Sequence, residues 1–207
     1  MFRLILILVF LAAPAMAGTR IIDGDTIELD GVTYRLNGID APEQGQRCGN
    51  WRCGVAATEK LAALVAGKAV RCDASGTDGY GRTIATCFAG NVDLGKAMIE
   101  AGVAWAFHRY SDVYAQDEQT AKARGLGIWS GTYTAPWDFR AEMWTDAAQK
   151  APEGCPIKGN ISDNGHIYHA PWSPWYSRTR INTARGERWF CSEAEAIEEG
   201  WRAPHWK

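Results

Sequence analysis

The feature that most constrains the fold is the segment from Ile21 to Glu43, which reads IIDGDTIELDGVTYRLNGIDAPE. Two runs of strand-forming residues, 26–29 and 32–36, flank the dipeptide Asp30-Gly31, which favours a two-residue hairpin turn. Pro42 has no backbone N–H to donate and therefore ends the strand pattern. The segment predicts an antiparallel hairpin whose far end carries an unusual number of carboxylates.

Periodicity and turn residues predict the elements that follow. The expected elements are helices over 54–65, 93–101 (capped by Asp93) and 111–125 (capped by Ser111), and strands over 69–72, 83–88 and 103–107. Strands that come first, with helices interleaved late, predict a small antiparallel β-barrel with helices packed on it. The segment 145–154 is small and polar and contains proline, which predicts a linker to a C-terminal module over 155–207.

Residues 1–17 have the layout of a secretory signal peptide. Arg3 supplies a positive charge, 4–13 form an apolar run too short to span a membrane, and Ala15-Met16-Ala17 is a cleavage pattern. The alternative is an N-terminal core helix. We expect an exported protein, secreted or periplasmic, that has no membrane span.

Charge and cysteine content narrow the class of protein further. The formal net charge is −2 at pH 7, so any binding of a polyanion must come from a local patch or a bound cation. The six cysteines are an even number, and an exported chain normally oxidises them to disulfides. Their spacing alone leaves 15 pairings open.

The acidic residues of the hairpin segment suggest a site for a hard cation. Asp25 and Asp40 each lie in a corner of the chain, so both carboxylates and the carbonyl of Ala41 could meet at one Ca²⁺. Glu43 follows closely enough to hold a water molecule, and Arg35 offers a fork of donors suited to a phosphate. This set fits metal-assisted hydrolysis of a phosphodiester.

Two considerations weigh against that interpretation. Aspartates beside glycine are commonly turn residues, and Asp30 is assigned a turn role only. Strict alternation along a strand also places Arg35 and Asp40 on opposite faces. The site therefore requires a bend or bulge near Gly38.

Four blocks in order resemble the thermonuclease, or staphylococcal-nuclease-like, family. The blocks are IIDGDTIEL, YRLNGIDAPE, TDGYGRTIA (77–85) and GLGIW (125–129), and the resemblance covers roughly residues 18–140. It implies a five-stranded OB-fold barrel with packed helices and a Ca²⁺-dependent nuclease. Two positions depart from the best-studied form: Ala41 replaces a threonine and Gly79 replaces a lysine.

The resemblance also implies a role for each matching residue. It implies metal ligation by Asp25, Asp40 and the Ala41 carbonyl, activation of water by Glu43, phosphate binding by Arg35 and Arg82, a nucleotide contact by Tyr80, and a supporting position for Asp23. For the exported, cysteine-bearing form we expect the pairs Cys48–Cys53 and Cys72–Cys87.

The C-terminal segment resembles a short domain known as the sunset domain, through KGNIS, IYH, TRI and GERWFCSEAEAIEEGWR. Its Cys155 and Cys191 could join His166 and His169 in a zinc site. The spacing is irregular, and we expect a Cys155–Cys191 disulfide in a small α+β module.

The whole sequence therefore predicts a signal peptide (1–17), a thermonuclease-like domain (18–144), a linker and the C-terminal module. The expected protein is an exported, monomeric Ca²⁺-dependent nuclease that cuts DNA and RNA with little sequence specificity. The alternatives are a catalytically idle OB-fold module that binds nucleic acid or protein, and a cell-envelope adaptor whose C-terminal module is the working part.

Overall fold

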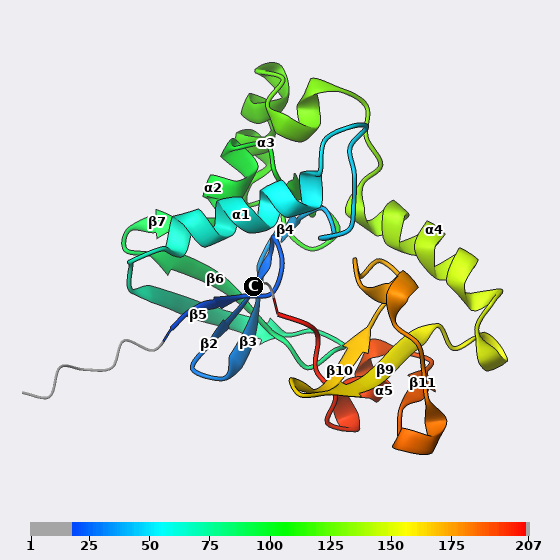
Figure 1. The fold of residues 1–207 in the computed structure, drawn as a ribbon. Coiled ribbons are helices and arrows are strands. Elements are labelled where there is room, and N and C mark those ends of the chain that lie inside the picture. The colour runs from blue at the N-terminus through cyan, green and yellow to red at the C-terminus, as the bar shows by residue number, and fades with distance from the viewer. Residues whose placement is uncertain (1–17, 206–207) are drawn as a thin grey trace, which may run out of the picture.

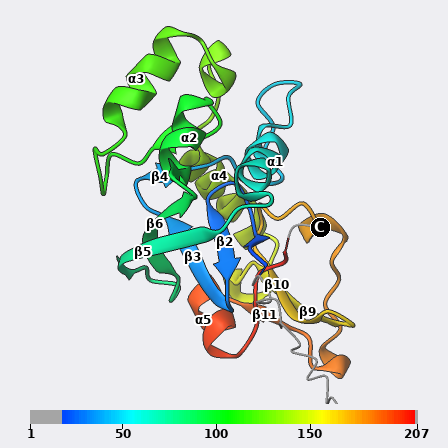
Figure 2. The ribbon, with the colours of Figure 1, turned by 90° about the vertical axis from the view of Figure 1, so that its left-hand side faces the viewer.

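A computed structural model describes residues 18–205, so the expected signal peptide lies outside the described residues. The first part of the chain forms the strands β1 (Arg20–Ile21), β2 (Thr26–Leu29), β3 (Val32–Leu36), β4 (Ile39–Asp40), β5 (Val70–Thr77), β6 (Thr83–Ala89), β7 (Val92–Asp93) and β8 (Trp105–Ala106). Its helices are α1 (Cys53–Val65), α2 (Leu94–Glu100), α3 (Ala115–Ala123) and α4 (Pro136–Ala148), with a 3₁₀ turn η1 over Gly127–Ser130. Helices α1 to α3 lie together on one side of the sheet (Figures 1 and 2).

The main sheet is mixed and has the order β1-β2-β3-β6-β5, with β7 paired to β6. Strands β3 and β6 run parallel, whereas the other pairs are antiparallel. The expected closed five-stranded barrel is not present in the described part of the chain. Gly38 adopts a φ of +73°, which turns the chain out of β3, and β4 then pairs with β8 in a separate two-stranded sheet.

The hairpin forms as the sequence predicts. Asp30 and Gly31 have φ angles of +53° and +79°, the left-handed pair that a two-residue turn between twisted strands requires. Helix α1 is also confirmed, and Asp93 caps α2 by accepting a hydrogen bond from the Lys96 N–H at 3.1 Å. Ser111 does not cap α3, because its Oγ accepts a hydrogen bond from the nearby Val113 N–H. Helix α3 begins four residues after Ser111.

The core of the first part lies between the sheet and helices α1 and α2. The buried side chains include Ile27, Leu36, Leu61, Met98 and Ile99. Each such side chain contributes roughly 1.5–3 kcal/mol when removed from water. This packing holds the ends of β2, β3 and β4 at fixed positions.

The chain from 152 onward adds a smaller layer. It comprises the 3₁₀ turn η2 (Pro152–Gly154), the antiparallel sheet β10-β9-β11, the 3₁₀ turns η3 (Tyr176–Arg178) and η4 (Thr183–Arg185), and helix α5 (Glu193–Glu198). The sheet strands are β9 (Ile157–Ser162), β10 (Gly165–His169) and β11 (Arg188–Phe190). The expected domain end at Trp144 falls inside α4, whose Trp144 packs against the core of this layer.

All six cysteines form the expected disulfides: Cys48–Cys53, Cys72–Cys87 and Cys155–Cys191. The zinc alternative is therefore wrong for Cys155 and Cys191. His169 lies instead between Asn160 Oδ1 and Ser173 Oγ, and the His166 ring stacks on Trp201.

Between residues 18 and 205, the structure contains no helix both long and apolar enough to cross a membrane.

Candidate active site

Asp25, Arg35 and Asp40 meet at the far end of the hairpin. Arg35 Nη2 donates to Asp40 Oδ1 at 2.9 Å, and Arg35 Nη1 forms an ion pair with Asp25 Oδ2. The bend at Gly38 makes this possible, because it rotates β4 relative to β3 and brings Arg35 and Asp40 to the same side. One guanidinium thus holds two carboxylates, of which Asp40 is fully buried.

The Asp25 carboxylate has further partners that fix its orientation. Its Oδ2 accepts from the Ala41 N–H at 2.7 Å, and its Oδ1 accepts from the Thr26 hydroxyl at 3.0 Å. Burial works to raise the pKa of Asp25, but Arg35 and the Ala41 N–H outweigh it, and the pKa lies below its usual value. Asp25 is therefore an ionised oxygen donor.

Asp23 supports Asp25 from the preceding turn. Its Oδ1 accepts from the Asp25 N–H at 3.0 Å. Burial, with the Asp25 charge adding to it, raises the pKa of Asp23 to about 7. Asp23 thus takes up a proton far more readily than Asp25 does.

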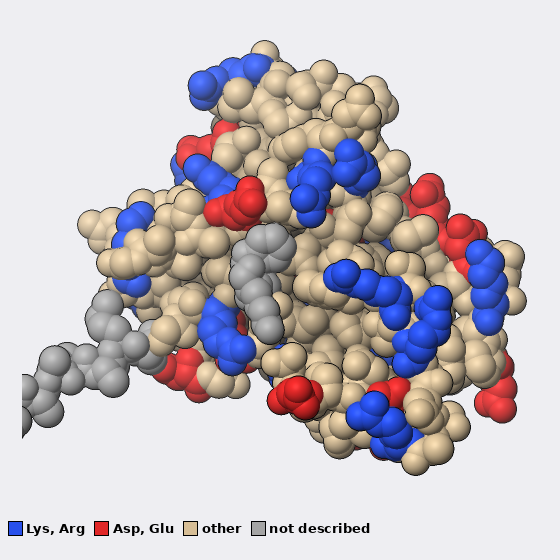
Figure 3. Space-filling model, viewed as in Figure 1, with Lys and Arg blue, Asp and Glu red and all other residues tan. Residues whose placement is uncertain are grey.

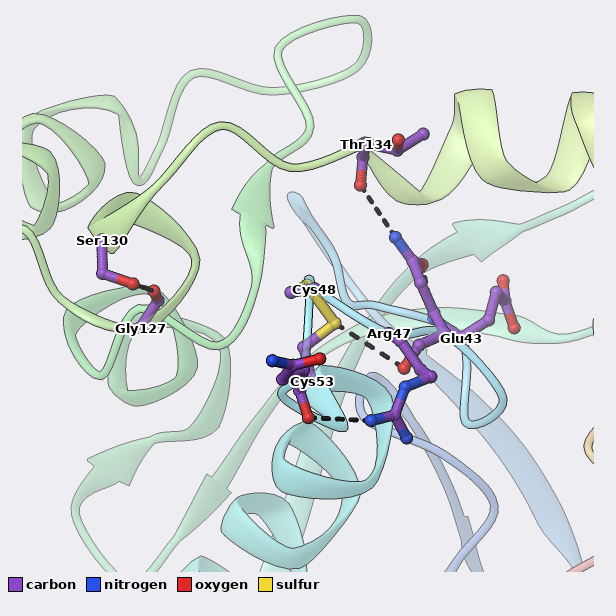
Figure 4. The surroundings of a disulfide bond; sticks show 9 residues. Glu43, Arg47, Cys48, Cys53, Gly127, Ser130 and Thr134 are labelled. Carbon is purple, nitrogen blue, oxygen red and sulfur yellow. Dashed lines mark hydrogen bonds between the residues drawn. A yellow bond between two sulfur atoms is a disulfide. The ribbon is translucent and has the colours of Figure 1, made fainter.

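Glu43 lies on a loop beside the Cys48–Cys53 disulfide, and a hydrogen bond ties this loop to Thr134 (Figure 4). The buried Gln46 side chain accepts from the Glu43 N–H at 3.1 Å and donates to the Thr134 carbonyl at 2.8 Å, just ahead of α4. The Cys48–Cys53 disulfide closes the same loop. At Gly54, a side chain is excluded because a Cβ would lie 1.7 Å from the Glu43 carbonyl oxygen.

Glu43 lines the same cavity as Asp25 and Arg35, and the Arg140 guanidinium links its side chain to the buried Asp40. Burial raises the pKa of this carboxyl to about 8, even though Arg140 works to lower it. The carboxylate form of such a group is a stronger base toward water than an ordinary glutamate is.

Arg82 is held by a turn between β5 and β6. Asp78 accepts from the Arg82 Nε at 2.7 Å and from the backbone N–H groups of Tyr80 and Arg82 at 2.9 and 3.0 Å. The Arg82 guanidinium carbon lies 5.1 Å from the centre of the Tyr80 ring, which is 41% exposed. Asp78 lies within the TDGYGR block. Aspartates in turns commonly accept hydrogen bonds from the N–H groups that follow, and this pattern could have identified Asp78 as the residue that orients Arg82.

Arg140 of α4 is a site residue that the sequence did not predict. Its Nη2 donates to Asp40 Oδ2 at 2.7 Å, and its Nη1 donates to Asp40 Oδ1 at 3.1 Å and to Glu43 Oε1 at 2.7 Å. These partners are 97 and 100 residues away along the chain. No local pattern signals a contact over that separation.

The C-terminal layer forms the other wall of the site. A cavity of about 880 Å³ is lined by residues of the hairpin, the Arg82 turn, α4 and the layer. Tyr168 of β10 donates to Glu193 of α5 at 2.9 Å, and burial raises the pKa of Glu193, while Arg82 and Arg140 oppose that rise. Near Glu43, the Trp172 carbonyl lies 2.8 Å from where a Cβ on Gly45 would be.

The donor set fits a divalent cation. Asp25 and Asp40 could supply carboxylate oxygens and Ala41 its backbone carbonyl, which are the ligands that Ca²⁺ prefers. The pKa values of Asp23 and Glu43 are raised mainly by burial, and neighbouring carboxylates add to the rise. Among residues 18–205, no group of three or more acidic, histidine or cysteine side chains gathers as a ready-made cage.

The face seen in Figure 3 shows basic side chains in several separate groups, with acidic ones between them. This distribution agrees with the small net charge. Arginines and carboxylates also line the cavity, among them Arg35, Arg82 and Glu43.

Comparison with known proteins identifies related chains. The family described as "Staphylococcal nuclease homologue" matches residues 33–131. The succinoglycan biosynthesis protein ExoI of Rhizobium meliloti (strain 1021) is 41% identical over 128 residues, which cover 57% of this chain and 66% of that protein.

Several relatives have names that mention a nuclease. An uncharacterized endonuclease of Escherichia coli O157:H7 is 34% identical over 129 residues, covering 58% of this chain and 81% of the relative. The micrococcal nuclease of Shigella flexneri is 30% identical over 158 residues, covering 65% of this chain and 87% of the relative. The family segment includes Arg35, Asp40, Glu43 and Arg82, whereas Asp23 and Asp25 precede residue 33 and Arg140 lies beyond residue 131.

Proposed function

This chain belongs to the staphylococcal nuclease family, and we propose that it is a Ca²⁺-dependent nuclease that hydrolyses DNA and RNA with little sequence specificity. The observation that carries the proposal is the convergence of Asp25 and Asp40 on Arg35, with Glu43 facing the same cleft. An OB-fold origin for the mixed sheet follows from the same family membership.

The proposed roles follow from the contacts. Asp25, Asp40 and the Ala41 carbonyl would hold the cation, which would offset phosphate charge and polarise a phosphoryl oxygen. Glu43 accepts a proton from the water that attacks phosphorus, the bond to the leaving oxygen breaks, and that oxygen takes a proton from solvent. Arg35 and Arg82 bind the phosphate oxygens, whose negative charge increases in the transition state. Tyr80 contacts the nucleotide, and Asp23 supports Asp25.

Export completes the proposal. The signal peptide expected at residues 1–17 and the three disulfides support a secreted or periplasmic monomer. Fractionation of cells that express the full chain tests this, and a cytoplasmic, uncleaved product would contradict it.

A nuclease assay with Ca²⁺, with Mg²⁺ and with chelator tests the activity. We expect cleavage of single-stranded DNA and of RNA with Ca²⁺ and none with chelator. Asp40→Ala should weaken Ca²⁺ binding in calorimetry. Full activity in excess chelator would overturn the metal site, and tight binding of DNA without cleavage would favour the idle binding module.

A further inference from the structure

The contacts of Arg140 reach both carboxylates on which the proposed chemistry depends. Its two terminal nitrogens cover both oxygens of Asp40, and one of them also bonds Glu43. The Arg140 side chain is 26% exposed, while the Asp40 side chain is fully buried. Burial works to lower the pKa of Arg140. Its hydrogen bonds to Asp40 and the charges of Asp40 and Glu43 outweigh burial and raise that pKa, so Arg140 stays positively charged.

A divalent cation would have to share those oxygens with Arg140. Ca²⁺ lies roughly 2.3–2.6 Å from its ligand oxygens. The Arg140 nitrogens lie 2.7 and 3.1 Å from the same two oxygens, so a cation on Asp40 would be within about 5 Å of the guanidinium. Positive charges that close repel each other strongly in a partly buried cleft.

We propose that Arg140 and the divalent cation compete for Asp40, so that Arg140 is a positioning residue that must release Asp40 and Glu43 before catalysis. The inference rests on the proposed metal-dependent nuclease and adds a residue outside the matched family segment. In this arrangement Arg140 keeps two buried carboxylates neutralised until the metal replaces it. Its release also uncovers Glu43, because the same Nη1 atom serves both.

The packing of α4 permits that release. Trp137 of α4 stacks on Phe107 and Trp144 packs against the core of the C-terminal layer, whereas the Arg140 side chain is partly exposed and can rotate toward solvent. The N-terminal approach to α4 is held by the bond from Gln46 to the Thr134 carbonyl. The Arg140 side chain can therefore leave Asp40 while the start of the helix stays in place.

Calorimetric titration of the oxidised chain with Ca²⁺ tests the competition. Arg140→Met should bind Ca²⁺ about tenfold more tightly than the unmodified chain, because a repelling charge is gone. Arg140→Lys should stay within about threefold, because it keeps the charge. Arg71→Met is the matched control: Arg71 is 59% exposed, pairs with Asp73 outside the cleft, and its loss changes the net charge equally.

The direction of the effect separates competition from a structural role. A substitution that merely damages the site weakens Ca²⁺ binding, so an affinity of Arg140→Met equal to or below that of the unmodified chain overturns the inference. If Arg140→Met fails to fold, amide exchange across 136–148 in the unmodified chain decides. Ca²⁺ should speed exchange there, and unchanged or slower exchange refutes competition.

The same titration distinguishes this inference from the proposed function. If the unmodified chain binds Ca²⁺ but cuts no nucleic acid, only the nuclease proposal fails. If neither the unmodified chain nor Arg140→Met binds Ca²⁺, both proposals are wrong. If Arg140→Met binds Ca²⁺ tightly and the unmodified chain does not bind it, the result supports competition most strongly.

Discussion

Replacing Asp78 with alanine removes the group that orients Arg82. In the structure the Asp78 carboxylate accepts three hydrogen bonds, two from backbone N–H groups and one from the Arg82 side chain. The bond to the guanidinium is between charged groups and is worth about 1.5–3 kcal/mol, and each neutral bond about 0.5–1.5 kcal/mol. Partial exposure of both side chains reduces the first figure.

The expected cost to activity follows from the loss of orientation. Arg82 would keep its charge but lose the contact that fixes its Nε, so we expect kcat/KM to fall by roughly 10- to 100-fold, or about 1.4–2.7 kcal/mol. Stability should fall by about 1–3 kcal/mol, measured by urea unfolding. Asp78→Asn should retain most of the stability, because its side-chain oxygen can still accept from the backbone of the turn.

Asp73→Ala is the matched control, since Asp73 lies on β5, the strand that leads into the Asp78 turn, and pairs with an arginine, Arg71, away from the cleft. It should leave kcat/KM within about twofold. The double variant Asp78→Ala/Arg82→Ala should be no worse than Arg82→Ala alone, because Asp78 acts through Arg82. The reasoning is refuted if Asp78→Ala keeps kcat/KM within threefold of the unmodified chain, or if the two losses simply add.

Three further predictions address the remaining parts of the site and the C-terminal layer. Glu43→Gln should lower kcat by roughly 10²-fold or more with native circular dichroism, and a loss below threefold would exclude Glu43 from the chemistry. Gly54→Ala should lower kcat by about 10²-fold, because the new Cβ, 1.7 Å from the Glu43 carbonyl oxygen, forces that carbonyl to move. Gly76→Ala is the control and should leave kcat unchanged, because nothing lies within 4 Å of its new Cβ. Equal kcat values for the two variants would contradict the positioning role of Gly54. Burial and Lys158 lower the pKa of His169 from 6.5 to about 4, so protonation favours the unfolded chain. The contribution of neutral His169 to the free energy of unfolding should be fully present above pH 6.5 and fall by at most about 3 kcal/mol toward pH 4. His169→Gln should remove this part of the pH dependence of urea unfolding.

Local features of the fold could be predicted from the sequence because their causes lie within a few residues. Asp30-Gly31 specifies its turn through two residues that tolerate positive φ, and Asp93 caps α2 with its own side chain. The order of Asp25, Arg35, Asp40 and Glu43 could likewise be identified, because these residues share one short segment. The bend at Gly38 was required by parity and is present.

The tertiary structure alone decided the rest. The parallel pairing of β3 with β6 and the open sheet depend on which edges meet, and β4 leaves the main sheet because its partner is β8, far along the chain. Arg140 reaches Asp40 from α4 across 100 residues, and Glu193 enters the same cleft from the C-terminal layer. Such contacts leave no periodic or spacing signal, because the chain between the partners can take any path until the core packs and brings their surfaces together.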